Sequence, residues 1–508
     1  MSVADSVPAG AGPELVFGLV GPVGVDISGV QEALTSCLRD MNYTSEVISV
    51  TQWLEKRLKA SGRPVPTALD ERIHLMQEEG NALRKKLSRG DAMAAVAVTL
   101  IRESRQEHTG ASDEVAIRHA YILRQLKHPD EVRRLREVYG ASFYLIGMYE
   151  NDTQRKSRLT AAIADSRDKH SKKASYTQGA EELIARDMAE ENRLGQNVRD
   201  TFPLSDFFLH THDRHVWEPE LRRFIELVFG NELRTPRPEE YLMFQARGVA
   251  LRSGDLSRQV GAVIASTDGS VIAMGMNDVP RVGGRWFIDG QSPDRRDLTF
   301  DTDRSEQLKR ETLGEILERL RENGLLSRKV SRRDPSAVLN DLVPLMEGTR
   351  LMGIGEFGRT VHAEMAALLD AAKRGVAVRN AILFATTFPC QNCAKHIIAS
   401  GIQVVVFMDP YPKSLTDILY EGVPKHGPML TLHEHERAPP AEDTIYFGTY
   451  LGVAPRMYMR LFPMRKRRDT EGNVIKWGEP AKMPRLVPSA DSAIIAREKD
   501  CAALLTDA

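Results

Sequence analysis

Short apolar runs alternate with amphipathic segments along the first part of the chain. Runs rich in Val, Ile, Leu, Phe and Tyr predict five buried strands, at 14–20, 45–50, 120–126, 141–149 and 204–212. Segments with apolar residues three or four positions apart predict the helices between them, at 28–41, twice across 68–106, at 128–140 and at 219–230. Strands that alternate with helices indicate a mostly parallel sheet with helices on both faces.

The pattern changes at 231–240, where two prolines interrupt it and where we place a domain boundary. The second part has a helix predicted at 239–252 and four strands predicted at 258–266, 270–277, 380–387 and 403–409. Two further helices are predicted in it, one after His362 and one at the Cys-x-x-Cys segment. A charged helical insertion covers about 281–355, and its clearest helix is at 305–324. The expected organisation is a flexible N-terminus (1–13), a first domain (14–232), a second domain (236–450) and a C-terminal extension (451–508).

Composition narrows the function classes. Lys and Arg number 69 and Asp and Glu number 70, a net charge of −1, so the whole chain has no electrostatic attraction to nucleic acid or anionic membranes. The first residues show no basic-then-apolar leader, and the longest apolar run, 92–101, is too short to span a bilayer. Four cysteines in 508 residues do not make a secreted disulfide framework. We therefore expect a cytoplasmic protein with no membrane segment.

The sequences "VHAEMAALLDA" (361–371) and "FPCQNCAKHIIASG" (388–401) hold a candidate zinc site. His362, Cys390 and Cys393 supply three ligands, the number that catalytic zinc takes while one position stays open for water. The cysteines are three residues apart near a helix start, which places them on one face and favours their thiolates. Glu364 is then free to move protons between that water, a ring nitrogen and a departing amine.

Two other interpretations of the cysteine pair remain open. A structural zinc site usually needs four protein ligands, and the sequence offers no fourth ligand nearby. A redox Cys-x-x-Cys pair would leave His362 and Glu364 without a purpose. The combined spacing of five specified positions favours catalytic zinc.

The segment from Arg258 to Asp409 resembles the deoxycytidylate (dCMP) deaminase family. Its motifs "RQVGAVI", "GMNDVP", "VHAEMAAL" and "FPCQNCAKHIIASGI" stand in the order that this family shows. The resemblance implies a cytidine-deaminase-like α/β/α domain. It also implies that His362, Cys390 and Cys393 bind zinc.

The same resemblance assigns roles around the zinc. It makes Glu364 the proton shuttle, and it places Asn277 and Ala363 against the substrate. A turn residue in "NDVP" is the alternative for Asn277. The insertion before His362 is longer than in compact family members, and it either caps the pocket or mediates oligomer contacts.

The stretch "DPYPKSLTDILYEG" (409–422) follows the last strand of the second domain. Tyr411 and Lys413 are candidates for contacts with the phosphate or base of the substrate. A plain strand-to-helix connection explains the same spacing, so both interpretations stay open.

The stretch "GLVGPVGVDISG" (18–29) lies between a predicted strand and helix, where a phosphate-binding loop would lie. A Walker pattern would end in Gly-Lys-Ser/Thr, and the lysine is missing, so phosphoryl transfer is not expected. Gly21, Gly24, Asp26 and Ser28 are candidates for holding a regulatory nucleotide. A structural turn fits equally well.

The first domain resembles P-loop nucleotide kinases in outline, including an arginine-containing segment at 155–170 that is either a phosphate lid or a solvated helix. A degenerate P-loop kinase-like domain fused to a CMP/dCMP-type zinc deaminase domain resembles the bacterial anti-phage dCTP deaminases. This implies deamination of free dCTP, and of dCMP as well, with depletion of the dCTP pool during infection. It further implies a homo-oligomer and, for some members, an inhibitory RNA antitoxin. The alternatives are a housekeeping dCMP deaminase and a zinc-stabilised nucleotide sensor.

Overall fold

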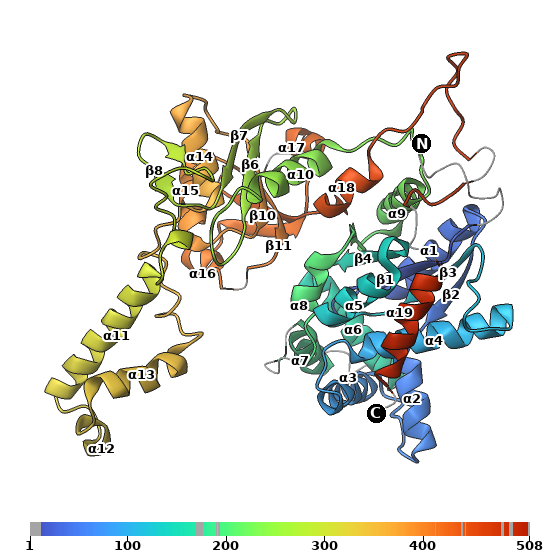
Figure 1. Ribbon diagram of the computed structural model, residues 1–508, viewed down its shortest axis with the longest axis horizontal. Helices are drawn as coiled ribbons and strands as arrows, with labels where there is room; N and C mark the ends of the chain where they lie inside the picture. The colour runs from blue at the N-terminus through green and yellow to red at the C-terminus, as the bar shows by residue number, and fades with distance from the viewer. Residues whose placement is uncertain are drawn as a thin grey trace. The chain divides into compact units, whose positions relative to one another are not determined.

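The structure is a computed structural model. It describes residues 12–167, 176–188, 190, 194–411, 413–437, 440–441, 443–478, 482–486 and 491–505. Nearly all of the N-terminal segment expected to be flexible (1–13) lies outside these residues. The chain divides into two compact units (Figure 1): Met1–Phe244, His426–Leu430 and Gly448–Ala508 in the first, and Gln245–Lys425 and Thr431–Phe447 in the second.

A six-stranded sheet forms the centre of the first unit, in the order β14-β5-β4-β1-β3-β2. The strands are β1 (Leu15–Val20), β2 (Thr44–Ile48), β3 (His119–Leu123), β4 (Phe143–Tyr149), β5 (Phe207–His210) and β14 (Gly452–Val453). β1 to β5 pair in parallel, and only β14 is antiparallel to its neighbour. The predicted mostly parallel sheet is therefore confirmed.

Helices cover both faces of this sheet. They are α1 (Ile27–Asp40), α2 (Val50–Ala60), α3 (Leu69–Lys86), α4 (Ala92–Thr109), α5 (Pro129–Tyr139), α6 (Asp152–Ser166), α7 (Thr177–Met188), α8 (Val198–Thr201), α9 (Arg214–Val228), α18 (Pro455–Leu461) and α19 (Asp491–Ala503). Successive residues of a strand point to opposite faces. Phe17 accordingly packs in the cluster with α1 and α9, whereas Val16 packs in the cluster with α4 and α5.

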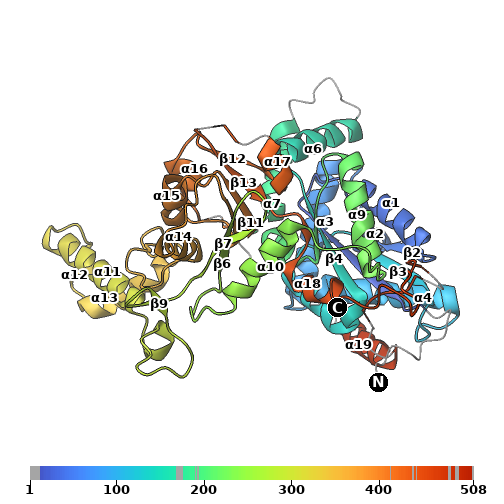
Figure 2. The same cartoon turned by 90° about the horizontal axis from the view of Figure 1, so that it is seen from above.

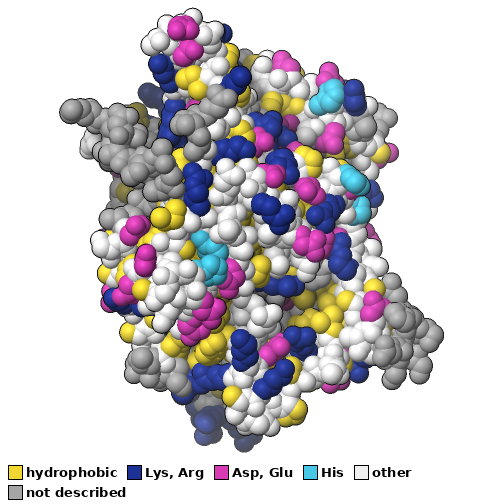
Figure 3. Space-filling view, turned by 90° about the vertical axis from the view of Figure 1, so that its right-hand side faces the viewer, with side chains coloured by type: hydrophobic (Ala, Val, Ile, Leu, Met, Phe, Trp, Pro, Cys, Tyr) yellow, Lys and Arg dark blue, Asp and Glu magenta, His cyan; other side chains and the backbone are white. Residues whose placement is uncertain are grey.

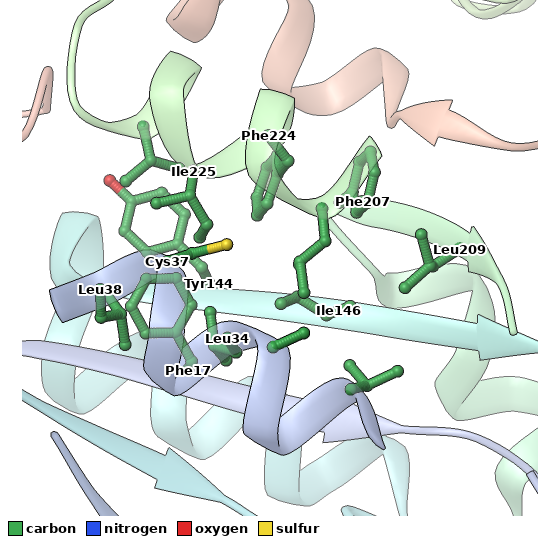
Figure 4. Close-up of a cluster of buried hydrophobic side chains, with 14 of the residues drawn as sticks. Phe17, Leu34, Cys37, Leu38, Tyr144, Ile146, Phe207, Leu209, Phe224 and Ile225 are labelled. Carbon is green, nitrogen blue, oxygen red and sulfur yellow. The ribbon is translucent and has the colours of Figure 1, made fainter. Parts of the chain in front are cut away.

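Figure 4 shows the cluster between the sheet and α1 and α9. Cys37 lies in it among Phe17, Tyr144 and Phe224 and has no exposed surface. Burial raises the pKa of its thiol to about 11. Cys37 is thus a core residue, as its place on the apolar face of the predicted helix suggests.

The C-terminal segment completes the first unit. β14 pairs with β5, and α19 packs on α4 and α5. Arg105 on α4 has no exposed side-chain surface; its guanidinium donates to Glu14 at 2.6 Å and to Glu498 on α19 at 2.7 Å. The sequence analysis expected residues 451–508 to form a separate C-terminal extension, whereas these contacts join the segment to the first unit. The predicted domain boundaries at residues 232 and 236 stay predictions.

The second unit is built on another six-stranded sheet, in the order β12-β13-β11-β10-β6-β7. Its strands are β6 (Gly261–Ala265), β7 (Val271–Met276), β10 (Ile382–Thr387), β11 (Val404–Asp409), β12 (Pro424–Pro428) and β13 (Ile445–Thr449). Its helices are α14 (Ala363–Lys373), α15 (Gln391–Ser400), α16 (Thr416–Leu419), α17 (Leu432–Arg437) and the last part of α10 (Pro238–Ala250), which begins in the first unit. β10 and β11 are parallel, and β6 is antiparallel to both β10 and β7.

Helices lie on both faces of the second sheet as well. On β6, Ile264 packs in the cluster with α14 and α15, while Gly261 lies on the opposite face of the sheet and faces α10. α14 lies so close to β7 that a Cβ on Gly275 would be 2.2 Å from the carbonyl oxygen of Ala363. This contact requires glycine, and it fixes the start of α14 against the sheet.

The insertion contains β8 (Pro280–Arg281), β9 (Arg285–Trp286), α11 (Arg304–Glu322), α12 (Arg328–Ser331) and α13 (Pro335–Met346). Its helices extend away from the sheet of the second unit (Figures 1 and 2). Leu313 and Leu317 of α11 and Val338 of α13 are buried between the helices. Within the described part of the chain, no helix has both the length and the apolar character needed to cross a membrane.

Candidate functional site

Two helix starts in the second unit carry the candidate ligands. His362 is the N-cap residue of α14 and Cys390 is the N-cap residue of α15, both with extended backbone. Neither side chain makes the usual capping hydrogen bond to its own helix. Cys393 lies one turn further along α15 and is 2% exposed. All three polar side chains are therefore available for another partner.

These side chains meet at one point. Nδ1 of His362 lies 3.3 Å from Sγ of Cys390 and 3.5 Å from Sγ of Cys393. Together they form a group whose candidate ligand atoms all lie within 4.8 Å of one another. The structure thus brings together the three predicted ligands from segments far apart in the sequence.

This group fits a zinc ion. Tetrahedral zinc binds nitrogen at about 2.0 Å and sulfur at about 2.3 Å, which places such ligands roughly 3.6 Å apart. The sulfur–nitrogen distances of 3.3 and 3.5 Å agree with that spacing. Among the described residues the group has three ligands and no fourth protein donor, which matches a catalytic rather than a structural site.

The electrostatics also favour a bound cation. A hydrogen bond from the thiol of Cys393, with a further one from His362, lowers the pKa of Cys390 to about 4. The same pair raises the pKa of Cys393, since the two sulfurs share one proton. The hydrogen bond to Cys390 raises the pKa of His362 to about 9. The cluster therefore keeps negative charge at Cys390, where a metal would be held.

Glu364 lies beside the ligand group without belonging to it. It sits in the first turn of α14, is 3% exposed, and its Oε2 accepts a hydrogen bond from the thiol of Cys393 at 3.4 Å. Burial raises the pKa of its carboxyl. A buried carboxyl beside the ligand group can take up and release a proton.

Asn277 and Ala363 occupy inner positions near the start of α14. The side chain of Asn277 is buried; its Oδ1 accepts from the amide of Val260 and its Nδ2 donates to the carbonyl of Arg258, both at 2.7 Å. These bonds hold the 258–260 segment, so Asn277 has a structural task in addition to any contact with substrate. Ala363 has no exposed surface. Substrate contacts for both residues stay predictions.

Tyr411 and Lys413 differ in their surroundings. Tyr411 is half-buried with the guanidinium of Arg258 5.9 Å from its ring centre, and burial raises the pKa of its hydroxyl. Lys413 is exposed. The next residue, Ser414, donates to the carbonyl of Pro389 at 2.9 Å and so supports the loop that carries Cys390.

Sequence reasoning did not single out Arg258 and Asp409, two charged candidates close to Tyr411. Asp409 ends β11, and its Oδ1 is buried without a hydrogen-bond partner among the described residues. Burial raises the pKa of this carboxyl to about 6, against the lowering effect of Arg258 and Arg247. An acid at the carboxyl end of a parallel strand is a recognised position for function, and "VVVFMD" carries that signal.

The glycine loop of the first unit has its polar groups already engaged. Asp26 is the N-cap residue of α1 and accepts from the amide of Gly29 at 3.0 Å. The amide of Val23 donates to Asp187 at 2.8 Å. Lys127 donates to the same carboxylate of Asp187 at 2.9 Å and to the carbonyl of Gly21 at 3.0 Å.

The remaining predicted loop residues have limited contacts. Gly24 has a positive φ of 93° and lies against the backbone of Arg155, where a side chain would not fit. Ser28 is exposed and accepts from the guanidinium of Arg124 at 3.2 Å. Nucleotide binding by Gly21, Gly24, Asp26 and Ser28 therefore stays a prediction.

The arginines of the 155–170 segment are also paired within the protein. Arg155 is buried and bonds to Asp152, Arg158 pairs with Glu150, and Arg167 binds Asp70 at 2.8 Å. A lid that binds phosphate would need these groups to leave their partners. Residues 168–170 lie outside the described part of the chain.

Known proteins resemble the second unit. The family of the "Cytidine and deoxycytidylate deaminase zinc-binding region" matches residues 236–409. ComE operon protein 2 of Bacillus subtilis is 43% identical over 53 residues, which are 10% of this chain and 28% of that protein. Deoxycytidylate deaminase of Enterobacteria phage T2 is 41% identical over 54 residues, 11% of this chain and 29% of that protein. The chain thus spans less than a third of these two relatives.

A longer match is deoxycytidylate deaminase of Mus musculus, 26% identical over 176 residues, which are 34% of this chain and 67% of that protein. Among solved structures, the apo dCMP deaminase of cyanophage S-TIM5 is similar over 43% of this chain and 100% of its own, with 16% identity and a TM-score of 0.22. The family match and the ligand group agree: residues 236–409 are similar to the zinc-binding region of cytidine and deoxycytidylate deaminases, and the cofactor of this site is Zn²⁺.

Proposed function

We propose that the second unit hydrolyses the exocyclic amine of a deoxycytidine nucleotide, yielding a deoxyuridine nucleotide and ammonia. The observation that carries this proposal is the convergence of His362, Cys390 and Cys393 next to a buried Glu364. Three ligands leave one position for water, and the carboxyl beside them provides a proton carrier.

The residues divide the work as follows. Zinc, when bound by His362, Cys390 and Cys393, supplies Lewis-acid activation of water. Glu364 accepts a proton through its carboxylate, passes it to the ring nitrogen, and later protonates the departing amine. The buried surroundings of Glu364 keep bulk water away from this proton, since the residue is 3% exposed. Arg258 and Tyr411 are candidates for holding the nucleotide nearby.

The nucleotide dCMP is the substrate favoured by the relatives, because two of them are deoxycytidylate deaminases. The family resemblance extends the proposal to dCTP and to depletion of the dCTP pool in anti-phage defence. A cytoplasmic homo-oligomer, a regulatory nucleotide in a P-loop kinase-like first domain and an inhibitory RNA antitoxin rest on the same resemblance. The alternative, housekeeping dCMP deamination, differs from it only in the substrate and its control.

Editing of a nucleic-acid strand is less well supported. A strand-binding surface would be a continuous basic stripe. The face in Figure 3 instead intersperses Lys and Arg side chains with Asp and Glu. The balanced total charge of −1 points the same way.

Zinc-loaded protein incubated in parallel with dCMP, dCTP, CTP and a cytosine-containing single strand tests the proposal. Ammonia and the uracil product are measured. Turnover of dCTP supports pool depletion, and turnover of dCMP alone supports housekeeping metabolism. If zinc is fully bound and all four substrates stay intact, the deaminase proposal is overturned in favour of a sensor.

A further inference from the structure

The first unit contains a cavity of about 420 Å³ beside the glycine loop. Its wall includes residues that come soon after three parallel strands: Val23 in the loop after β1, Ser49 directly after β2 and Arg124 directly after β3. The opposite wall is α3. Ligands of open α/β sheets bind outside the carboxyl ends of the strands, and the volume lies within the usual range for small-molecule sites.

Three buried polar atoms in this wall have no hydrogen-bond partner among the described residues. They are Oε1 of Gln77, Oε1 of Gln196 and Nε of Arg84. The three residues are 7%, 5% and 2% exposed, so each is more than nine-tenths buried. Such atoms are uncommon in folded proteins, and each costs about 1–3 kcal/mol. Their gathering around one cavity indicates a ligand that supplies two hydrogen-bond donors and one acceptor.

The charges of the wall are balanced except at one residue. Three basic side chains pair with carboxylates: Arg72 with Glu55, Arg84 with Glu131, and Lys127 with Asp187. Arg124 has no carboxylate partner in the part of the chain that the structure describes, and its guanidinium contacts only the hydroxyl of Ser28. Burial lowers the pKa of Arg124, with no acid to offset it. An anionic ligand would supply the missing charge.

The backbone next to Arg124 is held in an uncommon conformation. Gln125 has a φ of 62°, a region that residues other than glycine seldom adopt. The amides on either side are fixed, since Arg124 donates to the carbonyl of Ile48 at 3.1 Å and Leu126 donates to that of Leu19 at 2.9 Å. Strain of this kind collects at functional sites. Here it directs two successive residues, Arg124 and Gln125, to the cavity.

The glycine loop itself does not supply the anion site. The carboxylate of Asp187 already accepts from the amide of Val23 and from Lys127, and Asp187 is 1% exposed. A phosphate at that position would meet a buried negative charge. Among the described residues of the cavity wall, the cation without a carboxylate partner is Arg124, which contacts Ser28.

From these observations we infer that the cavity binds a nucleoside phosphate, with Arg124 holding the phosphate. Gln77, Gln196 and Arg84 would form hydrogen bonds with the edge of the base, because nucleobases present hydrogen-bond donors and acceptors side by side. Apolar side chains such as Ile73 and Met76 provide the surface for the flat ring. This inference rests on the regulatory nucleotide of the proposed function and names the residues that would hold it, but it does not depend on the deamination proposed for the second unit.

Binding by the full-length, zinc-loaded chain tests this inference. The probes are dTTP, ATP and inorganic phosphate, none of which carries a cytosine that could be deaminated. Isothermal titration calorimetry measures affinity and stoichiometry. We expect one nucleotide to bind at one site per chain and to bind at least tenfold more tightly than inorganic phosphate. No binding by either nucleotide, or equal binding by phosphate, would overturn the assignment.

Two variants locate the site. Arg124→Gln should weaken nucleotide binding by roughly 10- to 100-fold through loss of a charge-assisted hydrogen bond. Arg222→Gln is the matched control, since Arg222 lies on α9 and pairs with Asp40. Unchanged affinity in Arg124→Gln, or an equal loss in the control, would place any binding elsewhere.

Gln77→Met gives a signature that a structural role would not produce. The methionine removes an unpartnered buried oxygen, so the free protein should keep or raise its melting temperature. The stabilisation by the bound nucleotide should nevertheless fall. A variant that melts lower in the free state and binds normally would show that Gln77 is structural and would refute its part in the site.

Discussion

Two strand-to-helix corners of this protein look alike in outline and differ in how they use the positive end of the helix. At the β1–α1 corner, Asp26 caps the helix and the carboxylate of Asp187 accepts a hydrogen bond from the amide of Val23. At the β10–α15 corner, the capping position is Cys390, which makes no capping hydrogen bond. The first corner is neutralised by the protein's own carboxylates, whereas the second keeps its thiols for a metal. A glycine-rich loop before a helix is therefore no sufficient sign of a phosphate site.

The largest effect is expected at the second corner from Glu364→Ala. Removing the proton carrier beside the ligand group should lower turnover of the deoxycytidine nucleotide by roughly 10²- to 10⁴-fold or more. Zinc should remain bound, since Glu364 is outside the ligand group. Turnover and metal content are measured together, with the exposed Glu421→Gln as control. Loss of zinc in Glu364→Ala would show that this carboxylate holds the metal instead.

Cys393→Ser should remove the metal. With one of three ligands lost, we expect zinc content to fall below half and the melting temperature to drop by roughly 5 °C or more. Cys37→Ala is the matched control, because it loses a buried thiol outside the site and should keep its zinc.

Zinc content in this series is measured by atomic emission. A second group of possible ligands, Glu46, His108 and His119, lies in the first unit. Each measurement is therefore repeated in His119→Ala to assign residual metal. Full zinc occupancy in the Cys393→Ser, His119→Ala double variant would contradict the assigned ligands.

Asp187→Asn tests the first corner. The amide keeps an acceptor for Val23 but loses the buried ion pair with Lys127, so we expect the free energy of unfolding to fall by about 2–3 kcal/mol. Urea unfolding measures the loss. Basal deamination and zinc content should not change. An unaltered stability would mean that the carboxylate does not neutralise this corner.

A stability effect that appears only above pH 4 is expected at Asp409. Its folded-state pKa is raised to about 6 from 3.8, so its protonated form stabilises the fold; that stabilisation is complete below pH 3.8 and is lost as pH rises through 6. Arg258 and Arg247 are the charges that oppose the shift. Asp409→Asn should thus be more stable than the wild type at pH 8, by about 3 kcal/mol, and equal to it below pH 4.

Urea unfolding across that pH range checks the Asp409 prediction, with the exposed Asp301→Asn variant as control. Both proteins carry the same ligand group, so the comparison cancels any pH-dependent loss of metal. A variant less stable than the wild type at pH 8 would argue that the Asp409 carboxylate is needed in its charged form.

The features that the sequence predicted well depend on residues close together in the chain. The helix starts at His362 and Cys390 could be predicted from the spacing of nearby residues. The cluster that these residues form with Cys393 could be predicted as well, because it involves only two neighbouring strand–helix units. The strands β1 and β10 were likewise visible as apolar runs.

What the sequence could not predict depends on distant contacts. β14 has two residues and pairs with Phe207 and Phe208 from far along the chain, with no local pattern to mark it. The cavity wall joins Gln77 and Gln196, whose polar side chains would ordinarily be placed at the surface. The two hydrogen bonds of the Asn277 side chain, to the backbone of Arg258 and of Val260, could not be predicted from the motif "GMNDVP" either.

The buried arrangement of Arg105 between Glu14 and Glu498 has a consequence for biosynthesis. A ribosome makes the chain from the N-terminus, and domains generally fold as they emerge. Glu498 is translated after every residue of the second unit, so Arg105 lacks one of its two carboxylates until then. The second unit can therefore acquire its zinc while the first is still waiting for α19. Quality-control proteases would meet an unfinished first unit attached to a finished second one.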